Sequence, residues 1–203
     1  MKIYLKALND IFRNYHFYSI PILVSEVIFH LKYNGSFNKF KYLNSNFLSD
    51  SIPCSYFFLK KIKKFIIKND IKFSCDLGSG YGKILYYFGI LNNYKIDGVE
   101  FEKEIYVETL KLENNNINIF NENIINFDFI KNKYELFIIN DPLKKNKDLK
   151  ELIWKIKKNY KKIFLVFINL NCEKLNFVTE SLKIQDSLII SKSRNILFCS
   201  VEQ

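Results

Sequence analysis

The stretch of sequence that decides the fold is Phe73-Ser74-Cys75-Asp76-Leu77-Gly78-Ser79-Gly80-Tyr81-Gly82-Lys83. Three of the chain's six glycines lie in this short stretch of a 203-residue protein. The residues up to Leu77 are typical of a buried strand, and the glycines indicate a turn with unusual backbone angles, followed by a helix. Ligands of open parallel sheets bind at the carboxyl ends of strands, so we expect the binding site here.

The glycine spacing argues against two phosphate-binding loops. A dinucleotide fingerprint has the spacing G-x-G-x-x-G, whereas here the third glycine comes one residue early and Lys83 stands in the fingerprint's last position. A Walker loop has the spacing G-x-x-x-x-G-K and then Ser or Thr, but Ile84 follows Lys83. Both interpretations are therefore weakened.

Short apolar runs alternate with amphipathic segments from residue 72 onward. The pattern predicts strands at residues 72–77, 95–99, 117–120, 136–140 and 163–168, and helices at 82–91, 103–113 and 148–159. Alternation of this kind predicts an α/β fold with a mostly parallel sheet and helices on both faces. Two further strand-like segments, 187–191 and 195–201, predict a C-terminal antiparallel hairpin.

The first part of the chain reads as a helical extension, residues 1–50, before a main domain of residues 51–203. Ser19 and Pro21 predict the start of a helix that ends near Tyr33, and Ser55 is expected to cap a later helix. The segment between Asn34 and Pro53 reads as a loop. An earlier helix is predicted by an apolar stripe at Leu5, Leu8, Phe12 and Tyr15.

Composition excludes a disordered chain, because 48% of the residues are hydrophobic and 17% are aromatic. The net charge of +10 would favour an anionic partner, but Arg13 and Arg194 are the only arginines. An excess of Lys, Asn and Ile is what AT-rich codons produce, and base readout favours the arginine fork. We therefore expect a protein partner. Nucleic acid stays an alternative partner.

The cysteines Cys54, Cys75, Cys172 and Cys199 form no C-x-x-C pair, and with two histidines no zinc pattern arises. We expect no metal and buried reduced thiols. The sequence contains no apolar run of about 18 residues, as a membrane span needs, and no signal-peptide cleavage site. A cytoplasmic protein, monomeric or weakly oligomeric, is the default expectation.

The acid followed by G-x-G-x-G resembles the first motif of class I S-adenosylmethionine (SAM) methyltransferases. The resemblance implies a three-layer, Rossmann-like sheet of about seven strands and SAM as the cofactor. It also implies that Asp76 contacts the amino group of the methionine moiety, directly or through water. The glycines would let the loop pass against the amino-acid and ribose portions, with cofactor contacts from Gly78, Ser79, Gly80, Tyr81 and Gly82.

A second acid supports the resemblance. Asp97-Gly98-Val99-Glu100 ends an apolar strand about 20 residues after the loop, where such folds place a ribose-binding carboxylate. A carboxylate accepts hydrogen bonds from both ribose hydroxyls. The resemblance therefore implies that Glu100 binds the ribose and that Phe101 lies against the adenine edge.

Two later motifs depart from the family pattern. Members carry an acid after the third strand that binds the adenine amine, and here Asn123 takes that position, with Glu122 beside it as a substitute. Amino-methyltransferases often carry [DN]-P-P-[FY] after the fourth strand. This chain has Asn140, Asp141, Pro142 and then Leu143. The first three are the candidate substrate-orienting residues, and the missing aromatic argues against methylation of a flipped adenine.

The segment Pro53-Cys54-Ser55-Tyr56 before the glycine motif is similar to small protein-lysine methyltransferases, among them the ATP-synthase c-subunit type and Dot-like histone enzymes. The resemblance implies methyl transfer to an amine such as a protein lysine side chain. Two alternatives stay open. One is an RNA or small-molecule methyltransferase, and the other is a degenerate domain that binds RNA or protein without turnover. The helical extension would cover the cofactor or, alternatively, dock on a membrane or a partner.

Overall fold

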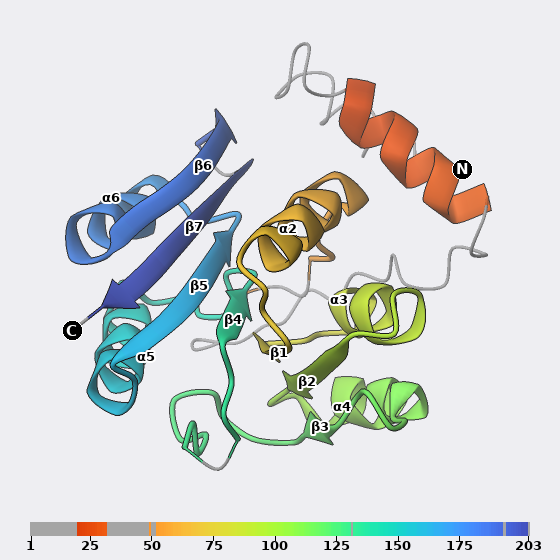
Figure 1. Ribbon diagram of the computed structural model, residues 1–203, viewed down its shortest axis with the longest axis horizontal. Helices are drawn as coiled ribbons and strands as arrows, with labels where there is room; N and C mark the ends of the chain where they lie inside the picture. The colour runs from red at the N-terminus through yellow and green to blue at the C-terminus, as the bar shows by residue number, and fades with distance from the viewer. Residues whose placement is uncertain (1–19, 32–48, 50–51, 131, 193, 203) are drawn as a thin grey trace.

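The computed structural model describes residues 20–31, 49, 52–130, 132–192 and 194–202, and its centre is a seven-stranded mixed sheet (Figure 1). The strand order is β3-β2-β1-β4-β5-β7-β6. The first five strands of this order are parallel, whereas β7 runs antiparallel to both β5 and β6. The strands are β1 (Phe73–Leu77), β2 (Lys95–Val99), β3 (Ile119–Phe120), β4 (Leu136–Ile139), β5 (Lys162–Ile168), β6 (Lys183–Ser191) and β7 (Arg194–Glu202).

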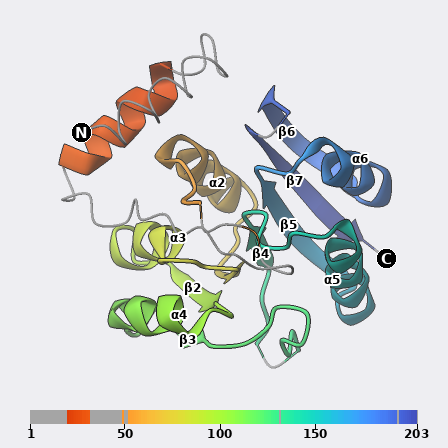
Figure 2. The ribbon, with the colours of Figure 1, turned by 180° about the vertical axis from the view of Figure 1, so that it is seen from behind.

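Helices cover both faces of the sheet (Figure 2). In β4, Leu136 and Ile138 pack on the side of α2, while Phe137 and Ile139 pack on the side of α5. Because both faces are buried, a central strand reads as one continuous apolar run. The helices are α2 (Tyr56–Lys68), α3 (Lys83–Leu85) with the π-helical turn η1 (Tyr86–Ile90), α4 (Lys103–Thr109) with the 3-10 turn η2 (Leu110–Leu112), α5 (Asn146–Asn159) and α6 (Cys172–Ser181).

The predicted α/β class, the three layers and the C-terminal hairpin are confirmed, but some elements differ. The sequence pattern does not predict α6, because few apolar residues mark its inner face. Its start is set locally by Asn171, whose Oδ1 accepts the N–H of Lys174 at 3.0 Å. β6 begins at Lys183, four residues before the predicted start, since an exposed edge strand does not need alternating apolar residues. β3 has two residues, because Ile117 pairs with Asn114 instead.

Residues 20–31 form a helix that packs beside α2. The ring of Phe29 stacks on Tyr56 with 3.9 Å between centroids. Ser55 caps α2 as predicted, accepting the N–H of Phe58 at 3.3 Å. The predicted stripe of Leu5 to Tyr15, the Ser19 cap and most of the expected loop lie outside the described residues. The division at residue 50 stays a prediction.

Three of the four cysteines are buried, as expected, but Cys172 at the start of α6 is exposed, so the expectation of a buried thiol is wrong there. None of the helices in the described ranges has the length and apolar character needed to cross a bilayer.

Candidate active site

The predicted motifs meet at one edge of the sheet. β1 lies between β2 and β4, with Asp76 in register with Gly98 on one side and Ile138 on the other. The glycine turn follows β1, Glu100 follows β2 and Asn140 follows β4. Because these strands are parallel, their carboxyl ends open on the same side, where α/β folds bind ligands.

The glycine turn has a backbone that other residues adopt poorly. Gly78, Gly80 and Gly82 have φ angles of 87°, 54° and 78°, all in the left-handed region. A Cβ added to Gly78 would lie 2.3 Å from Cβ of Pro142, so the turn passes directly against the chain that follows β4. A Cβ on Gly82 would lie 2.5 Å from Cδ1 of Leu112. Left-handed backbone angles at all three positions, together with close packing at Gly78 and Gly82, therefore account for the G-x-G-x-G spacing.

Hydrogen bonds hold the turn in place. The N–H groups of Gly78 and Ser79 both donate to the carbonyl of Val99, at 2.9 and 3.0 Å. The N–H of Gly80 donates to Oε2 of Glu100 at 2.8 Å, and Oγ1 of Thr109 donates to the carbonyl of Gly80 at 2.8 Å. Sequence reasoning did not identify Thr109, because a threonine on an amphipathic helix gives no signal of a contact with a distant turn.

Glu100 is buried and oriented by the main chain. Its Oε1 accepts the N–H of Glu102 at 2.8 Å, in addition to the bond from Gly80 to Oε2. Burial raises the pKa of Glu100, and these N–H donors oppose the rise. Each carboxylate oxygen keeps one acceptor site. Glu100 can therefore still accept two hydroxyl donors.

Asp76 has a buried carboxylate that accepts no hydrogen bond from the part of the chain that the structure describes. Burial raises its pKa well above the usual range, and the nearby Glu100 adds to the rise. Oγ of Ser79 is likewise buried and unpaired among the described residues. Buried polar groups are nearly always hydrogen-bonded, so these atoms have the capacity to bind a donor that is not among the described residues.

The residues predicted to contact adenine follow strands that end at the same edge of the sheet. The side chain of Asn123, however, is used in a local hydrogen bond. Its Oδ1 accepts the N–H of Ile125 at 2.9 Å and so closes a local turn. Glu122 is exposed. Phe101 is also exposed, and Tyr81 is half-buried. The contacts predicted for these residues stay predictions.

The polar side chain at the end of β4 is already engaged. Nδ2 of Asn140 donates to the carbonyl of Ile52 at 2.8 Å, and Oδ1 of Asn140 accepts from Nδ2 of Asn169 at 2.9 Å. The carbonyl of Pro142 accepts the N–H of Ser49 at 3.1 Å. Ser49 and Ile52, which precede α2 in sequence, thus both contact the chain at the end of β4.

Asp141 is held by a buried lysine. It has a left-handed φ of 40°, and its Oδ1 pairs with Nζ of Lys174 in α6. Lys174 is 2% exposed and also donates to the carbonyl of Leu143. Burial raises the pKa of Asp141, and Lys174 opposes this. Sequence reasoning missed Lys174, since a lysine on a surface helix is expected to face water.

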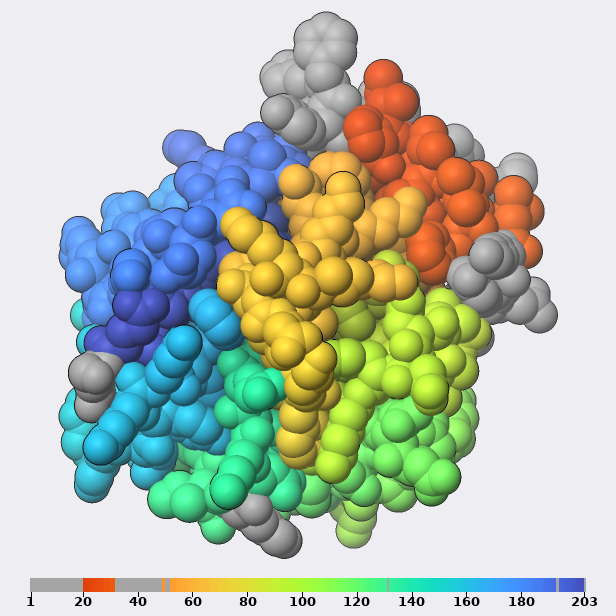
Figure 3. All heavy atoms as spheres, in the orientation of Figure 1, coloured from red at the N-terminus to blue at the C-terminus, as the bar shows by residue number. Residues whose placement is uncertain are grey.

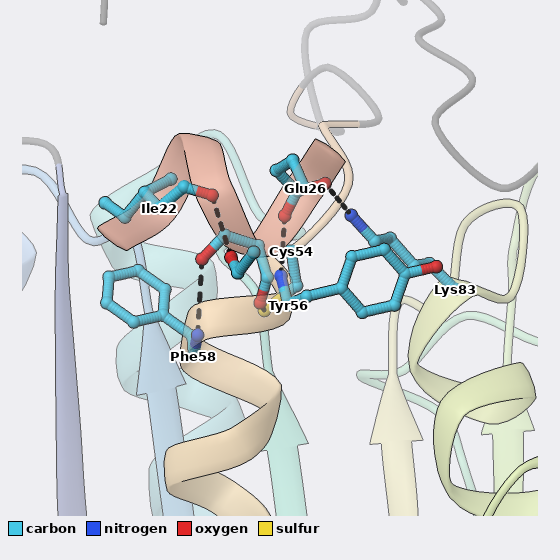
Figure 4. A network of polar contacts seen from close by, with 8 residues as sticks. Ile22, Glu26, Cys54, Tyr56, Phe58 and Lys83 are labelled. Atoms are coloured by element: carbon cyan, nitrogen blue, oxygen red, sulfur yellow. Dashed lines mark hydrogen bonds and ion pairs between the residues drawn. The ribbon is translucent and has the colours of Figure 1, made fainter. Parts of the chain in front are cut away.

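The helix 20–31 is tied to the residue that follows the glycine turn (Figure 4). Oε2 of Glu26 pairs with Nζ of Lys83 at 2.9 Å, and Oε1 accepts the N–H of Tyr56 at 2.6 Å. Nζ of Lys83 also lies 4.0 Å from the ring centroid of Tyr56. Burial lowers the pKa of Lys83, and Glu26 opposes this effect.

No protein-family model matches the chain, and no curated protein sequence matches it. Solved structures do match. An RNA methyltransferase from Salinibacter ruber in complex with S-adenosyl-L-homocysteine has a TM-score of 0.59 at 9% identity, over 75% of this chain and 95% of that one. This chain has the class I SAM-dependent methyltransferase fold.

Two more structures with the methyltransferase fold match at similar strength. Magnesium protoporphyrin IX methyltransferase from Synechocystis with bound SAM has a TM-score of 0.54 at 11% identity, over 72% of this chain and 78% of that one. N-methyltransferase NodS from Bradyrhizobium japonicum has a TM-score of 0.53 at 10% identity, over 71% and 96%. These proteins are named for different acceptors, so the shared methyltransferase fold carries no information on the acceptor.

Proposed function

We propose that this protein is a SAM-dependent methyltransferase whose acceptor is an amine, in particular a lysine side chain of a protein. The observation that carries the proposal is the buried carboxylate of Asp76, which is unpaired among the described residues and lies beside the glycine turn. SAM carries an ammonium group on its methionine moiety and two hydroxyls on its ribose. The first is a donor suited to Asp76, and the hydroxyls suit the open acceptor sites of Glu100. The residues present therefore fit SAM.

When bound, SAM supplies a methyl group on a positively charged sulfur, which is a good leaving group. The chain then has to hold the acceptor, orient it and exclude water. A lysine acceptor must be neutral to act as a nucleophile, and burial of its ammonium group lowers its pKa. Oδ1 of Asn140 accepts one hydrogen bond and keeps a second acceptor site for an amine N–H.

Two observations favour an amine over a flat base. Leu143 stands where an aromatic would stack on a planar acceptor, and its side chain is buried in the core. The segment that resembles lysine methyltransferases, Pro53 to Tyr56, leads into α2 at the capped Ser55. The chain has only two arginines, which favours a protein acceptor over nucleic acid.

Isothermal titration with SAM tests the cofactor assignment. We expect the wild type to bind, and the double variant Asp76→Ala/Glu100→Ala to bind at least about 100-fold more weakly, since two charge-assisted contacts are lost. The matched control is Asp128→Ala/Glu180→Ala, which removes two exposed acids and should bind like the wild type. Absence of binding by the wild type, or equal binding by both double variants, would remove the proposal.

Transfer of a labelled methyl group from SAM into a cell lysate tests the acceptor. A labelled product that protease degrades and nuclease leaves intact supports a protein acceptor. A product sensitive to nuclease, or too small for either enzyme, assigns the acceptor to RNA or to a small molecule.

A second candidate is a methyltransferase-like module that binds a partner without turnover. The engagement of Asn140 with Ile52 and Asn169 favours it, because this side chain would otherwise orient the acceptor. SAM binding without any methyl incorporation would select this candidate.

A further inference from the structure

Asn169 carries one of the buried polar atoms that have no partner in the described part of the chain. Its Oδ1 accepts no hydrogen bond there, as is also true of the carboxylate of Asp76. Asn169 follows directly after β5 and is half-buried as a residue, so other atoms of it reach solvent. Burial of an amide oxygen without a donor is costly. This oxygen therefore has the capacity to bind a donor that is not among the described residues.

Asn169 lies at the same edge of the sheet as the candidate active site. β5 is the parallel neighbour of β4, with Ile139 in register with Phe167, so the two strands end side by side. Nδ2 of Asn169 donates to Oδ1 of Asn140 at 2.9 Å. β5 is two strands away from β1, so Asn169 lies about 10 Å across the sheet from the end of β1. It is thus on the β4 side of the edge, away from the glycine turn.

A chain of hydrogen bonds fixes the orientation of the Asn169 amide. The carbonyl of Ile52 can only accept, so Asn140 has to present Nδ2 to it. Asn140 then presents Oδ1 to Asn169, which has to present Nδ2 in turn. Ile52 lies just before α2, which occupies the middle of the face in Figure 3, between β6 and α3. The chain of amides therefore begins beside a packed helix and ends at Oδ1 of Asn169, which is an acceptor.

The backbone of Asn169 is held from a neighbouring strand. It has a left-handed φ of 59°, which asparagine tolerates better than most residues. Its N–H donates to the carbonyl of Asn195 in β7 at 2.9 Å. The buried side chain of Asn195 bonds both the N–H and the carbonyl of Leu170, at 3.0 and 2.7 Å. Left-handed residues that their surroundings hold this firmly cluster at ligand sites.

We propose that Oδ1 of Asn169 binds the methyl acceptor and takes one N–H of its aliphatic amine. This inference rests on the proposed function, since it names the residue that holds the amine. Asp141, the acid next to Asn140, is paired with Lys174. An unpaired carboxylate would stabilise the ammonium form of the amine, which has no lone pair for the methyl group. A neutral amide oxygen accepts an N–H without adding negative charge, so it suits the nucleophilic form.

Recognition through an N–H also limits how many methyl groups one amine receives. A neutral primary amine has two N–H groups, and each added methyl group replaces one of them. A neutral dimethylated amine therefore has no N–H to donate to Asn169. We expect the third transfer to the same nitrogen to be disfavoured.

Titration of the isotope-labelled free protein with n-butylamine, followed by nuclear magnetic resonance, tests the binding site without methyl transfer. We expect a saturable shift of the side-chain amide resonances of Asn169, because its oxygen gains a donor. Butyltrimethylammonium has the same carbon chain and the same charge at neutral pH but has no N–H, and it should leave these resonances unshifted. No shift with butylamine, or equal shifts with both compounds, would overturn the proposal.

A glycine substitution removes the side chain and keeps the left-handed backbone. With the backbone resonance of Leu170 as the reporter, Asn169→Gly should bind butylamine about tenfold more weakly, the equivalent of one hydrogen bond to a charged donor. The matched control is Asn93→Gly, the same change at an exposed asparagine with a left-handed φ of 50° before β2. This control should bind like the wild type. If the two variants bind equally, Asn169 does not hold the amine and the proposal fails.

The number of methyl groups on the product gives a separate test. Labelled methyl groups are transferred from SAM into a cell lysate, and acid hydrolysis followed by chromatography separates mono-, di- and trimethyl-lysine. We expect labelling that depends on the added protein to appear in mono- and dimethyl-lysine. Trimethyl-lysine as the main product would overturn the proposal. Absence of any labelled lysine would instead remove the proposed function, and the butylamine titration would still decide whether Asn169 binds an amine.

Discussion

The ends of β1 and β4 are neighbours in the sheet, yet the polar side chains at the two ends differ in their hydrogen bonding. At the end of β1 the buried Asp76 finds no partner in the described part of the chain. At the end of β4, Asn140 and Asp141 are both bound, to Ile52 and Asn169 in one case and to Lys174 in the other. An unpaired buried carboxylate lowers the stability of the free protein, whereas pairing offsets the desolvation cost of the buried groups.

The two ends therefore differ in what they can still bind. The carboxylate of Asp76 can accept a hydrogen bond from a donor that is not among the described residues, and an unpaired buried group of this kind is typical of a ligand site. The β4 end is closed by the protein's own segments, so an acceptor that reaches Asn140 has to share it with the main chain near residue 52. The four predictions below test this contrast.

The largest effect is expected from removal of the lysine that closes the β4 end. Lys174→Met should lower the free energy of unfolding by about 3–5 kcal/mol at neutral pH, because Asp141 is left in its partly buried site without its counter-charge. Urea denaturation measures this. The double variant Lys174→Met/Asp141→Asn should recover much of the loss. A loss below about 1 kcal/mol, as expected for the exposed pair in Lys183→Met, would show that the β4 end is not held this way.

The next effect comes from the contact between the two ends. Gly78→Ala should lower the free energy of unfolding by about 2–4 kcal/mol and weaken SAM binding, because its Cβ would overlap Pro142 in a left-handed backbone. Denaturation and titration calorimetry measure the two effects. Adding Pro142→Gly makes room for the methyl group and should recover part of the stability. No recovery would mean that backbone strain alone carries the loss.

In contrast to the two substitutions above, Asp76→Asn should raise the free energy of unfolding. Burial raises the folded-state pKa of Asp76 above its unfolded value, so the wild type loses stability as pH rises between those two values. The variant lacks this loss and should be more stable by about 1–3 kcal/mol at mildly alkaline pH. The advantage should vanish near pH 4, about the pKa of an unfolded aspartate. Thermal unfolding across this pH range measures it.

The same substitution should weaken SAM binding about 10- to 150-fold, the equivalent of one charge-assisted hydrogen bond. If Asp76→Asn is less stable than the wild type at alkaline pH and binds SAM equally well, Asp76 is not an unpaired carboxylate that binds the cofactor. The proposed difference between the two ends would then be wrong.

The smallest effect is expected at Asn140. Asn140→Ala should lower the free energy of unfolding by about 1 kcal/mol, because the carbonyl of Ile52 loses its donor, and should leave SAM affinity unchanged. The control Asn159→Ala removes an exposed asparagine at the end of α5 and should change stability by less than about 0.5 kcal/mol. A fall in SAM affinity would show that the two ends act as one site.

Much of the fold could be predicted from the sequence because it depends on local patterns. The apolar runs of β1, β2, β4 and β5 and the turn between β6 and β7 are read from neighbouring residues. The missed α6 has a weak apolar pattern, and β3 is shortened by a local bridge at Ile117. The start of the edge strand β6 could not be predicted, since its exposed residues show no alternation of apolar and polar side chains.

Some residues of the candidate site could likewise be predicted from the sequence, and others could not. Asp76, Glu100 and the three glycines could be found from spacing, because each follows its own strand or turn. Lys174 and Ile52 could not, because they contact the β4 end from 33 and 88 residues away along the chain. Nothing in the residues around Asn140 tells which distant segment meets it.

By itself, the sequence determined the left-handed glycine turn and the acids at the ends of β1 and β2, because backbone angles and strand ends depend on residues close in the chain. Only the tertiary structure decided which of the polar groups at that edge are satisfied. Pairing depends on which segments fold into hydrogen-bond reach, and burial then sets how much an unpaired group costs. For that reason Asp76 has no partner among the described residues, whereas Asn140 is bound to Ile52 and Asn169.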